Sequence, residues 1–320
     1  MNIIITGGAG FLGQRLAKAL LTQEQIRFTS LTLADVIEPS SPLDDARVRC
    51  VQADLGNQAE VNALVSADTG LLYHLAAIVS SHAEADFDLG VKVNIDATRY
   101  LLEAARHQAP GCRFVFSSSL AVFGGELPEL IQDNTSVCPQ SSYGMEKAVC
   151  ELMVNDYARK GFIDGRVLRL PTISVRPGKP NKAASSFASG IIREPLQGEE
   201  TVCPVALSLP MWLSSPATVI ENFVRAALVP AEAFGASRTV NLPGITVTVQ
   251  QMIESLARVV GDQVCRHISY QEDEAISRIV ASWPGRFDIS RAQGMGFIQD
   301  ADFDAVIRSF IQHDLQGAQA

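Results

Sequence analysis

The chain has 320 residues, of which 47% are hydrophobic and 19% are charged, and its formal net charge is −9. This length is more than one hydrophobic core comfortably fills, so we expect a large domain with a smaller one attached. The acidic balance disfavours a nucleic-acid partner, and no apolar run reaches the ~18 residues that a membrane span requires.

The first half of the chain alternates apolar, strand-like runs with stretches whose apolar residues recur at helical spacing. Strands are expected at 2–6, 28–35, 48–55, 70–77, 113–119 and 165–171. Helices are expected at 11–23, 59–66, 91–108 and 143–160. Strands that alternate with helices form a parallel sheet covered on both faces. The sequence therefore predicts an α/β fold with a Rossmann-type, doubly wound parallel sheet.

The pattern changes after Pro171. Residues 171–190 are rich in Pro, Gly, Ser and Lys and predict a long loop, and such loops often carry function. Further on, we expect helices at 216–229 and 248–261, a strand able to rejoin the sheet at 237–244, and a candidate strand at 263–271.

These elements predict two domains. The first is a dinucleotide-binding domain over 1–172, and we expect the chain to return to this domain at 211–243. The second is a smaller, C-terminal substrate-binding domain over 173–210 and 244–320.

The stretch IIITGGAGFLGQRL at the start of the chain places Gly7, Gly10 and Gly13 between a predicted strand and a predicted helix. There the backbone must turn sharply, and a pyrophosphate must approach without a Cβ in the way. The helix N-terminus then offers N–H groups and a positive dipole end to the phosphates. Glycines alone would fit a plain turn, but a strand before and a helix after predict dinucleotide binding.

Asp35 closes the next predicted strand. An acidic residue at this place accepts hydrogen bonds from the adenosine ribose hydroxyls and repels a 2′-phosphate. We therefore predict NAD as the cofactor, with NADP disfavoured. The alternative interpretation of this residue alone is an aspartate that begins a loop.

Further motifs follow in a set order: Asp54-Leu55, HLAA at 74–77, FSSS at 116–119 and Tyr143-x-x-x-Lys147. Together they resemble the extended short-chain dehydrogenases/reductases, which include nucleotide-sugar epimerases and dehydratases. The resemblance implies that 75–77 border the ribose and nicotinamide, that Asn94 helps to hold the active-site helix and a water, and that 171–172 lie near the nicotinamide. The implied cofactor-binding residues are Gly7, Gly10, Phe11, Leu12, Gly13, Asp35, Asp54, Leu55, Leu75, Ala76, Ala77, Asn94, Tyr143, Lys147, Pro171 and Thr172.

The chemistry is expected from Tyr143, Lys147 and Ser119. Tyr143 and Lys147 are four residues apart on a predicted helix, so they share one face. A tyrosine hydroxyl titrates near ~10, and a nearby ammonium would lower its pKa and make it a usable base. Ser119 would orient the reacting oxygen, and it is chosen over Ser117 and Ser118 because its spacing to Tyr143 resembles the family's. The alternative is a tyrosine that packs beside a solvated lysine.

The substrate loop differs from that of the nucleotide-sugar epimerases, which carry an Asn-containing segment after the sixth strand. Here 174–186 supply basic and hydroxyl side chains, which suit a small polyhydroxy carboxylate because arginine can clamp a carboxylate. On charge alone, a diphosphate fits equally well. The predicted substrate-binding residues are Ser119, Tyr143, Thr172, Ser174, Arg176, Lys179 and Ser185.

Two segments, 169–196 and 282–292, resemble the branch of the family that oxidises four-carbon sugar acids. The resemblance implies oxidation of such an acid at C2, with hydride transfer to NAD and with Tyr143 as the base. Trp283 and Arg286 belong either to the pocket and its lid or to the interior of the smaller domain.

Three functions stay open at this stage: a sugar-acid dehydrogenase, a nucleotide-sugar epimerase or dehydratase with firmly held NAD, and a non-catalytic NAD-binding protein. The presence of Ser119, Tyr143 and Lys147 argues against the third. The resemblance also implies a homodimer that pairs the helices at 94–108 and 143–160.

The cysteines and histidines predict neither disulfides nor a metal site. The six cysteines form no CxxC pair, and the five histidines lack metal-ligand spacing such as HExxH. With no basic and apolar leader at its strand-like start, we expect a chain with reduced thiols, located in the cytoplasm.

Overall fold

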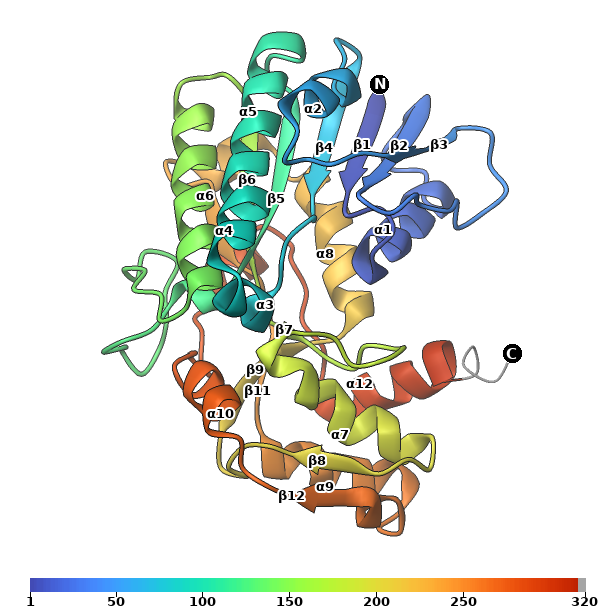
Figure 1. The fold of residues 1–320 in the computed structure, drawn as a ribbon, viewed down its shortest axis with the longest axis vertical. Helices are drawn as coiled ribbons and strands as arrows, with labels where there is room; N and C mark the ends of the chain where they lie inside the picture. Colours follow the sequence, from blue (N-terminus) through green and yellow to red (C-terminus); the bar gives the residue numbers. More distant parts are fainter. Residues whose placement is uncertain (316–320) are drawn as a thin grey trace.

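A computed structural model describes residues 1–315, and its larger part is built on one seven-stranded sheet (Figure 1). The strand order is β10-β6-β5-β4-β1-β2-β3, and every pair of neighbours is parallel. The strands are β1 (Asn2–Thr6), β2 (Ser30–Asp35), β3 (Val48–Gln52), β4 (Thr69–His74), β5 (Arg113–Ser119), β6 (Asp164–Leu170) and β10 (Thr239–Asn241). The predicted doubly wound, Rossmann-type sheet is confirmed.

Helices cover both faces of this sheet, and β1 shows why. Ile3 and Ile5 pack into one hydrophobic cluster while Ile4 packs into the other, because successive side chains of a strand point to opposite faces. The first cluster includes α1 (Phe11–Thr22) and α8 (Pro216–Leu228). The second includes α2 (Gln58–Leu64), α5 (Ala97–Gln108) and α6 (Ser142–Arg159). A π-helical segment, Val91–Asp96, leads directly into α5.

The smaller part lies below the sheet in Figure 1 and has a hydrophobic core of its own. It holds a three-stranded sheet of β7 (Thr172–Ile173), β9 (Pro210–Ser214) and β11 (Ile245–Thr248), and a pair of β8 (Thr201–Cys203) and β12 (Ile268–Tyr270). Its helices are α7 (Phe187–Leu196), α9 (Val249–Val260), α10 (Glu274–Ala281) and α12 (Phe303–Phe310). Further short α-helices are α3 (Ser80–Ala85), α4 (Phe87–Gly90) and α11 (Ser290–Gly294).

The loop predicted over 171–190 is wrong in part. It contains β7 and the beginning of α7, because Phe187, Ile191 and Ile192 are buried in the core of the smaller part. Tertiary packing therefore outweighs the weak helical signal of a segment that holds Gly190 and Pro195.

The chain crosses between the two parts more than once. Within the segment expected to return to the first domain, β9 pairs with β7 and β11, whereas α8 packs on α1 and β10 pairs with β6. The domain boundaries themselves stay a prediction. Within residues 1–315, no helix is long and apolar enough to cross a bilayer.

Candidate active site

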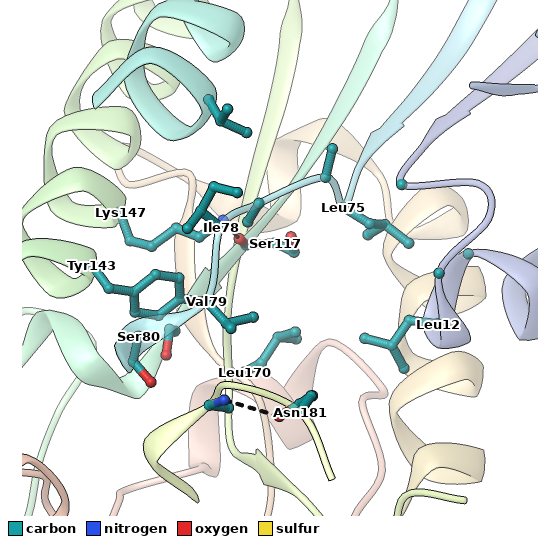
Figure 2. Close-up of a pocket in the computed structure, with 18 of the residues that line it drawn as sticks. Leu12, Leu75, Ile78, Val79, Ser80, Ser117, Tyr143, Lys147, Leu170 and Asn181 are labelled. Carbon is teal, nitrogen blue, oxygen red and sulfur yellow. Dashed lines mark hydrogen bonds between the residues drawn. The ribbon is translucent and has the colours of Figure 1, made fainter. Parts of the chain in front are cut away.

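A cavity of about 600 Å³ opens where the parallel strands end and the smaller part begins (Figure 2). Its wall takes residues that end or follow each of the strands β1 to β6. Ligands of open α/β sheets bind at this edge, outside the carboxyl ends of the strands. The smaller part closes the cavity with Arg176, Asn181, Ala183, Ser185 and Trp283.

The cavity brings together most residues that the sequence singled out. Those that line it are Gly7, Gly10, Phe11, Leu12, Gly13, Asp35, Asp54, Leu55, Leu75, Ala76, Ala77, Ser119, Tyr143, Lys147, Pro171, Thr172, Arg176 and Ser185. Asn94, Ser174 and Lys179 do not line it.

The glycine turn leaves room for a ligand at the N-terminus of α1. Gly7 has φ +73°, a backbone conformation that favours glycine, and a Cβ there would lie 2.9 Å from the backbone nitrogen of Ala76. Gly10 is the N-cap of α1 and provides no side-chain cap. The first N–H groups of a helix have no partner inside it, so they stay available to a pyrophosphate.

Asp35 adds an acceptor beside this turn. Its carboxylate accepts a hydrogen bond from the backbone N–H of Ala9 at 3.1 Å, which leaves further lone pairs for ribose hydroxyls. Elsewhere in the wall, the Nζ of Lys92 lies 3.2 Å from the carboxylate of Asp54. These features fit an adenine dinucleotide: a glycine turn, a helix N-terminus without a side-chain cap, and a carboxylate at the end of β2.

Three consecutive serines at the end of β5 make three different contacts. The backbone carbonyl of Ser117 accepts a hydrogen bond from Lys147 Nζ at 2.9 Å. The hydroxyl of Ser118 donates to Glu151 at 2.5 Å, away from the cavity's reacting groups. The hydroxyl of Ser119 faces Tyr143 and lowers the pKa of its phenol by hydrogen bonding. Ser119 is thus the serine whose hydroxyl contacts Tyr143, and its role in orienting a reacting oxygen stays a prediction.

Burial dominates the electrostatics of the tyrosine and lysine pair. It raises the pKa of Tyr143 to about 12, against the opposing effects of Ser119 and of the positive charge of Arg176. Burial also lowers the pKa of Lys147 to about 8. This differs from the predicted lowering of the Tyr143 pKa by Lys147: burial outweighs the groups that lower the pKa, and these are Ser119 and Arg176, while the Lys147 ammonium donates to Ser117. Arg176 is the cation that favours the phenolate here.

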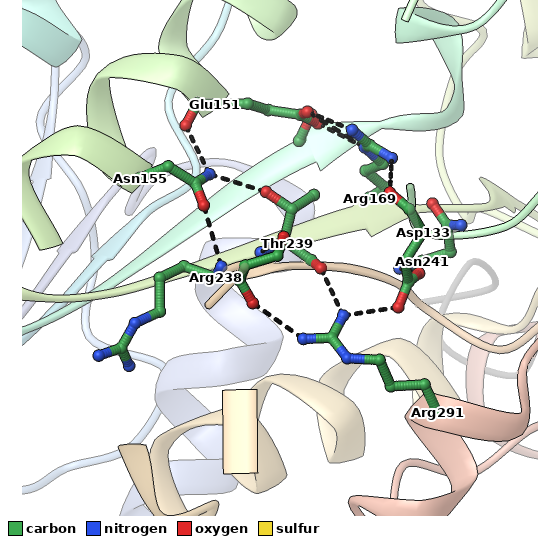
Figure 3. Close-up of polar contacts among 10 residues, drawn as sticks. Asp133, Glu151, Asn155, Arg169, Arg238, Thr239, Asn241 and Arg291 are labelled. Atoms are coloured by element: carbon green, nitrogen blue, oxygen red, sulfur yellow. Dashed lines mark hydrogen bonds and ion pairs between the residues drawn. The ribbon is translucent and has the colours of Figure 1, made fainter. Parts of the chain in front are cut away.

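A polar network behind the site joins α6, β6, β10 and α11 (Figure 3). Arg169 on β6 donates to both carboxylate oxygens of Glu151, with distances of 2.7 to 3.1 Å. Arg169 also donates to the backbone carbonyl of Asp133, and the carboxylate of Asp133 accepts from Arg291 at 2.6 Å. The network thereby ties the loop before α6 and helix α11 to the sheet that carries Ser119.

The loop after β6 separates the predicted substrate residues. Arg176 and Ser185 line the cavity, and Arg176 forms no ion pair with any residue among 1–315. The structure contradicts two of the predicted substrate-binding residues, because neither lines the cavity. Ser174 is fully buried and donates to the carbonyl of Ala188 at 2.8 Å, and Lys179 is exposed and outside the cavity.

Several residues of the site carried no recognisable signal in the sequence. Ser80 and Asn181 line the cavity; Ser80 Oγ accepts from the backbone N–H of Ala184 at 3.0 Å and so joins α3 to the substrate loop. This contact joins segments that are far apart in the chain, so no local pattern marks it.

The sequence left open whether Trp283 and Arg286 belong to the pocket or to the interior of the smaller domain. Trp283 lines the cavity, whereas Arg286 lies outside it and pairs with Glu129.

His74 supports the floor of the site from inside the sheet. Its ring nitrogens contact Thr6 Oγ at 2.7 Å and Thr98 Oγ at 2.9 Å, which links β1, β4 and α5. Burial lowers the pKa of His74 to about 3, so the imidazole is neutral. The sequence motif HLAA contained this residue, but nothing in it assigned the histidine a structural task.

Residues 3–214 match the profile of the NAD dependent epimerase/dehydratase family. The chain is 54% identical over 315 residues to D-erythronate dehydrogenase of Haemophilus influenzae, a match that covers 98% of this chain and 100% of that protein. It is 51% identical over 319 residues to D-erythronate dehydrogenase of Cupriavidus necator, covering 98% of each.

Solved structures match the whole chain. A nucleoside-diphosphate-sugar epimerase from Agrobacterium tumefaciens superposes with a TM-score of 0.92 at 41% identity, covering 99% of this chain and 95% of that one. The L-threonine 3-dehydrogenase of Trypanosoma brucei superposes with a TM-score of 0.87 at 26% identity, covering 98% of each chain. The likeness therefore extends beyond the sheet into the smaller part.

Proposed function

The chain belongs to the NAD-dependent epimerase/dehydratase family, the extended short-chain dehydrogenases/reductases, and we propose that it oxidises D-erythronate at C2 to 2-oxo-tetronate. One observation carries this proposal. One cavity is lined by the glycine turn, by Tyr143 and Ser119, and by Arg176, whose guanidinium has no ion-pair partner within residues 1–315. The two D-erythronate dehydrogenases that are about half identical to this chain, over nearly its full length, support the same substrate.

In the proposed reaction, Arg176 binds the carboxylate of the acid through two parallel hydrogen bonds. Ser119 donates to the C2 oxygen, and Tyr143 in its phenolate form accepts the proton of the C2 hydroxyl. NAD, held by the glycine turn and Asp35, supplies the acceptor for the C2 hydride. Loss of one proton and one hydride leaves the 2-oxo acid. Because burial raises the pKa of Tyr143, we expect the rate of oxidation to rise toward alkaline pH.

A second candidate is the epimerisation of a nucleotide sugar, because the Agrobacterium tumefaciens protein with that name is 41% identical over nearly the whole chain. Measurement of NADH absorbance with D-erythronate, related C4 and C5 aldonates, and UDP- and GDP-sugars separates the two. We expect NADH to accumulate with D-erythronate and the nucleotide sugars to stay unchanged. Conversion of a nucleotide sugar without net formation of NADH would instead identify the protein as an epimerase.

We propose three further properties, which concern the cofactor, the oligomeric state and the location of the protein. Asp35 favours NAD over NADP, since its carboxylate would repel a 2′-phosphate. A homodimer through 94–108 and 143–160 would cover Leu152, which is 69% exposed on α6. The third is a location in the cytoplasm, where a reducing environment would keep the six cysteines as thiols.

A further inference from the structure

Glu146 is a buried acid that the proposed reaction does not use. It lies on α6 between Tyr143 and Lys147, and its side chain is fully buried. One carboxylate oxygen, Oε2, accepts a hydrogen bond of 2.5 Å from Asn94 Nδ2, and the other, Oε1, has no hydrogen-bond partner among the described residues. Burying such a group is costly, so its retention calls for a local task.

The partner of Glu146 holds the cavity wall. Asn94 Oδ1 accepts from the backbone N–H of Ile78 at 2.8 Å, and Asn94 Nδ2 donates to the backbone carbonyl of Ile78 at 3.0 Å. Ile78 lines the cavity with its sequence neighbours Ala77 and Val79, and Lys147 lines the same cavity (Figure 2). Both polar groups of one wall residue are thus clamped by one amide.

Glu146 and Ile78 require the same orientation of that amide. The N–H and the carbonyl of Ile78 face Oδ1 and Nδ2, and Oε2 of Glu146 accepts the second proton of Nδ2. The amide is therefore held from both sides with Oδ1 toward the Ile78 N–H. The backbone of Asn94 is held as well, since its carbonyl accepts from Thr98 Oγ at 2.6 Å and from Cys150 Sγ at 3.1 Å.

Helix α4 keeps Glu146 in place from the other side. A Cβ at Gly90 would collide with Glu146 Oε1, so any larger residue there would have to displace the carboxyl group. Gly90 has φ −58°, which any residue adopts, so the close approach to Glu146, and not the backbone, favours glycine at this position.

We propose that Glu146 is a positioning residue, which fixes the cofactor-facing wall at Ile78 through the side chain of Asn94. This inference rests on the proposed function only for its kinetic measurements with D-erythronate. The task needs a hydrogen-bond acceptor and not a charge, so glutamine at 146 can perform it and alanine cannot.

The test compares Glu146→Ala and Glu146→Gln with a matched pair at Glu194. Glu194 is also a buried carboxylate with one unpartnered oxygen, but it pairs with Arg193 and lies outside the cavity. For the wild type and each variant without added ligand, we would measure the rate of hydrogen exchange at the Ile78 backbone amide and the midpoint of thermal unfolding. NAD affinity is measured by calorimetry, and KM for NAD and kcat with D-erythronate by NADH absorbance.

We expect Glu146→Ala to speed Ile78 exchange and to weaken NAD binding about tenfold, with the KM for NAD affected more than kcat. Glu146→Gln should restore both to within about threefold of the wild type. Glu194→Ala and Glu194→Gln should lower the thermal midpoint without altering Ile78 exchange or NAD affinity. Unchanged Ile78 exchange in Glu146→Ala, an equal rise in Glu194→Ala, or a Gln variant as impaired as the Ala variant would each overturn the proposal.

Gly90→Ala keeps the test decisive if Glu146→Ala does not fold. It should speed Ile78 exchange by displacing the carboxyl group, and should add nothing further when combined with Glu146→Ala, which removes the collision. Additive effects of the two changes would contradict the proposed contact. Because exchange and NAD binding need no substrate, a failure of D-erythronate oxidation leaves these measurements intact and is distinguishable from a failure of this proposal.

Discussion

The ammonium of Lys147 donates a hydrogen bond to the backbone carbonyl of Ser117 at 2.9 Å, and so joins helix α6 to the end of strand β5. This contact places Lys147 Nζ 5.7 Å from the centre of the Tyr143 ring. An ammonium has three protons, so two remain for groups in the cavity after Ser117 is satisfied. The hydrogen bond to Ser117 therefore fixes the Lys147 ammonium relative to the sheet. The first turn of α6 places the phenol of Tyr143 in the same cavity.

The hydroxyl of Tyr143 is the proposed proton acceptor, so Tyr143→Phe should lower kcat for D-erythronate by about 10²- to 10⁴-fold. NAD affinity and the thermal midpoint should stay close to the wild-type values, since only one oxygen is lost from the cavity. Steady-state kinetics and calorimetry check this. Full activity of the variant would remove Tyr143 from the chemistry.

Arg176 has two proposed effects that can be separated by substitution. Arg176→Lys keeps a positive charge but loses the planar fork, so the KM for D-erythronate should rise about tenfold with a small change in kcat. Arg176→Gln also removes the charge that lowers the Tyr143 pKa, so its pH–rate profile should move to higher pH. Lys179→Gln is the control, because Lys179 lies outside the cavity and its loss should leave KM unchanged. Equal effects at 176 and 179 would argue against a specific carboxylate clamp.

Asp35 should set the choice of cofactor. Asp35→Asn removes the negative charge that would repel a 2′-phosphate, while an acceptor oxygen remains for the Ala9 N–H. The ratio of kcat/KM for NAD to that for NADP should fall by about tenfold or more, mainly through better use of NADP. Measurement of both cofactors at saturating substrate tests this, and an unchanged ratio would place the discrimination elsewhere.

His74 should make the fold sensitive to acid. Its pKa is about 3 in the folded protein against 6.5 for the free side chain, so the unfolded chain binds the proton more tightly and protonation favours unfolding. The stabilising effect is complete above about pH 6.5 and is lost as pH falls toward 3, with roughly 3 kcal/mol lost near pH 4. His74→Gln should be less stable at neutral pH but show a flatter acid limb.

The control for this measurement is His107→Gln, since His107 is an exposed residue on α5. Its unfolding free energy against pH should run parallel to that of the wild type. A His74→Gln variant with the wild-type acid limb would show that another group causes the acid sensitivity.

The sequence predicted the sheet well because each of its strands carries a local signal. Uninterrupted apolar runs such as Ile3–Ile5 mark strands that are buried on both faces, and the glycines mark the turn into α1. Tyr143 and Lys147 could be placed together because four residues on a helix span one turn.

The smaller part was predicted less well because long-range packing defines it. Helix α7 owes its stability to Ile191 and Ile192 in a shared core. Strand β7 exists only by pairing with β9, 41 residues further on (Thr172 with Leu213, Ile173 with Ser214). The positions of Ser174 and Lys179 depend on the path of a loop that composition does not specify. The contact of Glu146 with Asn94 joins positions 52 residues apart, and no periodic pattern encodes it.

The most direct test of the proposed chemistry uses D-erythronate that carries deuterium at C2. Incubation with the protein and NAD, followed by mass spectrometry of the reduced cofactor, should show one deuterium in each reduced nicotinamide formed, together with a slower rate than with unlabelled acid. Reduced cofactor without deuterium would contradict oxidation at C2, and no reduced cofactor at all would contradict the dehydrogenase itself.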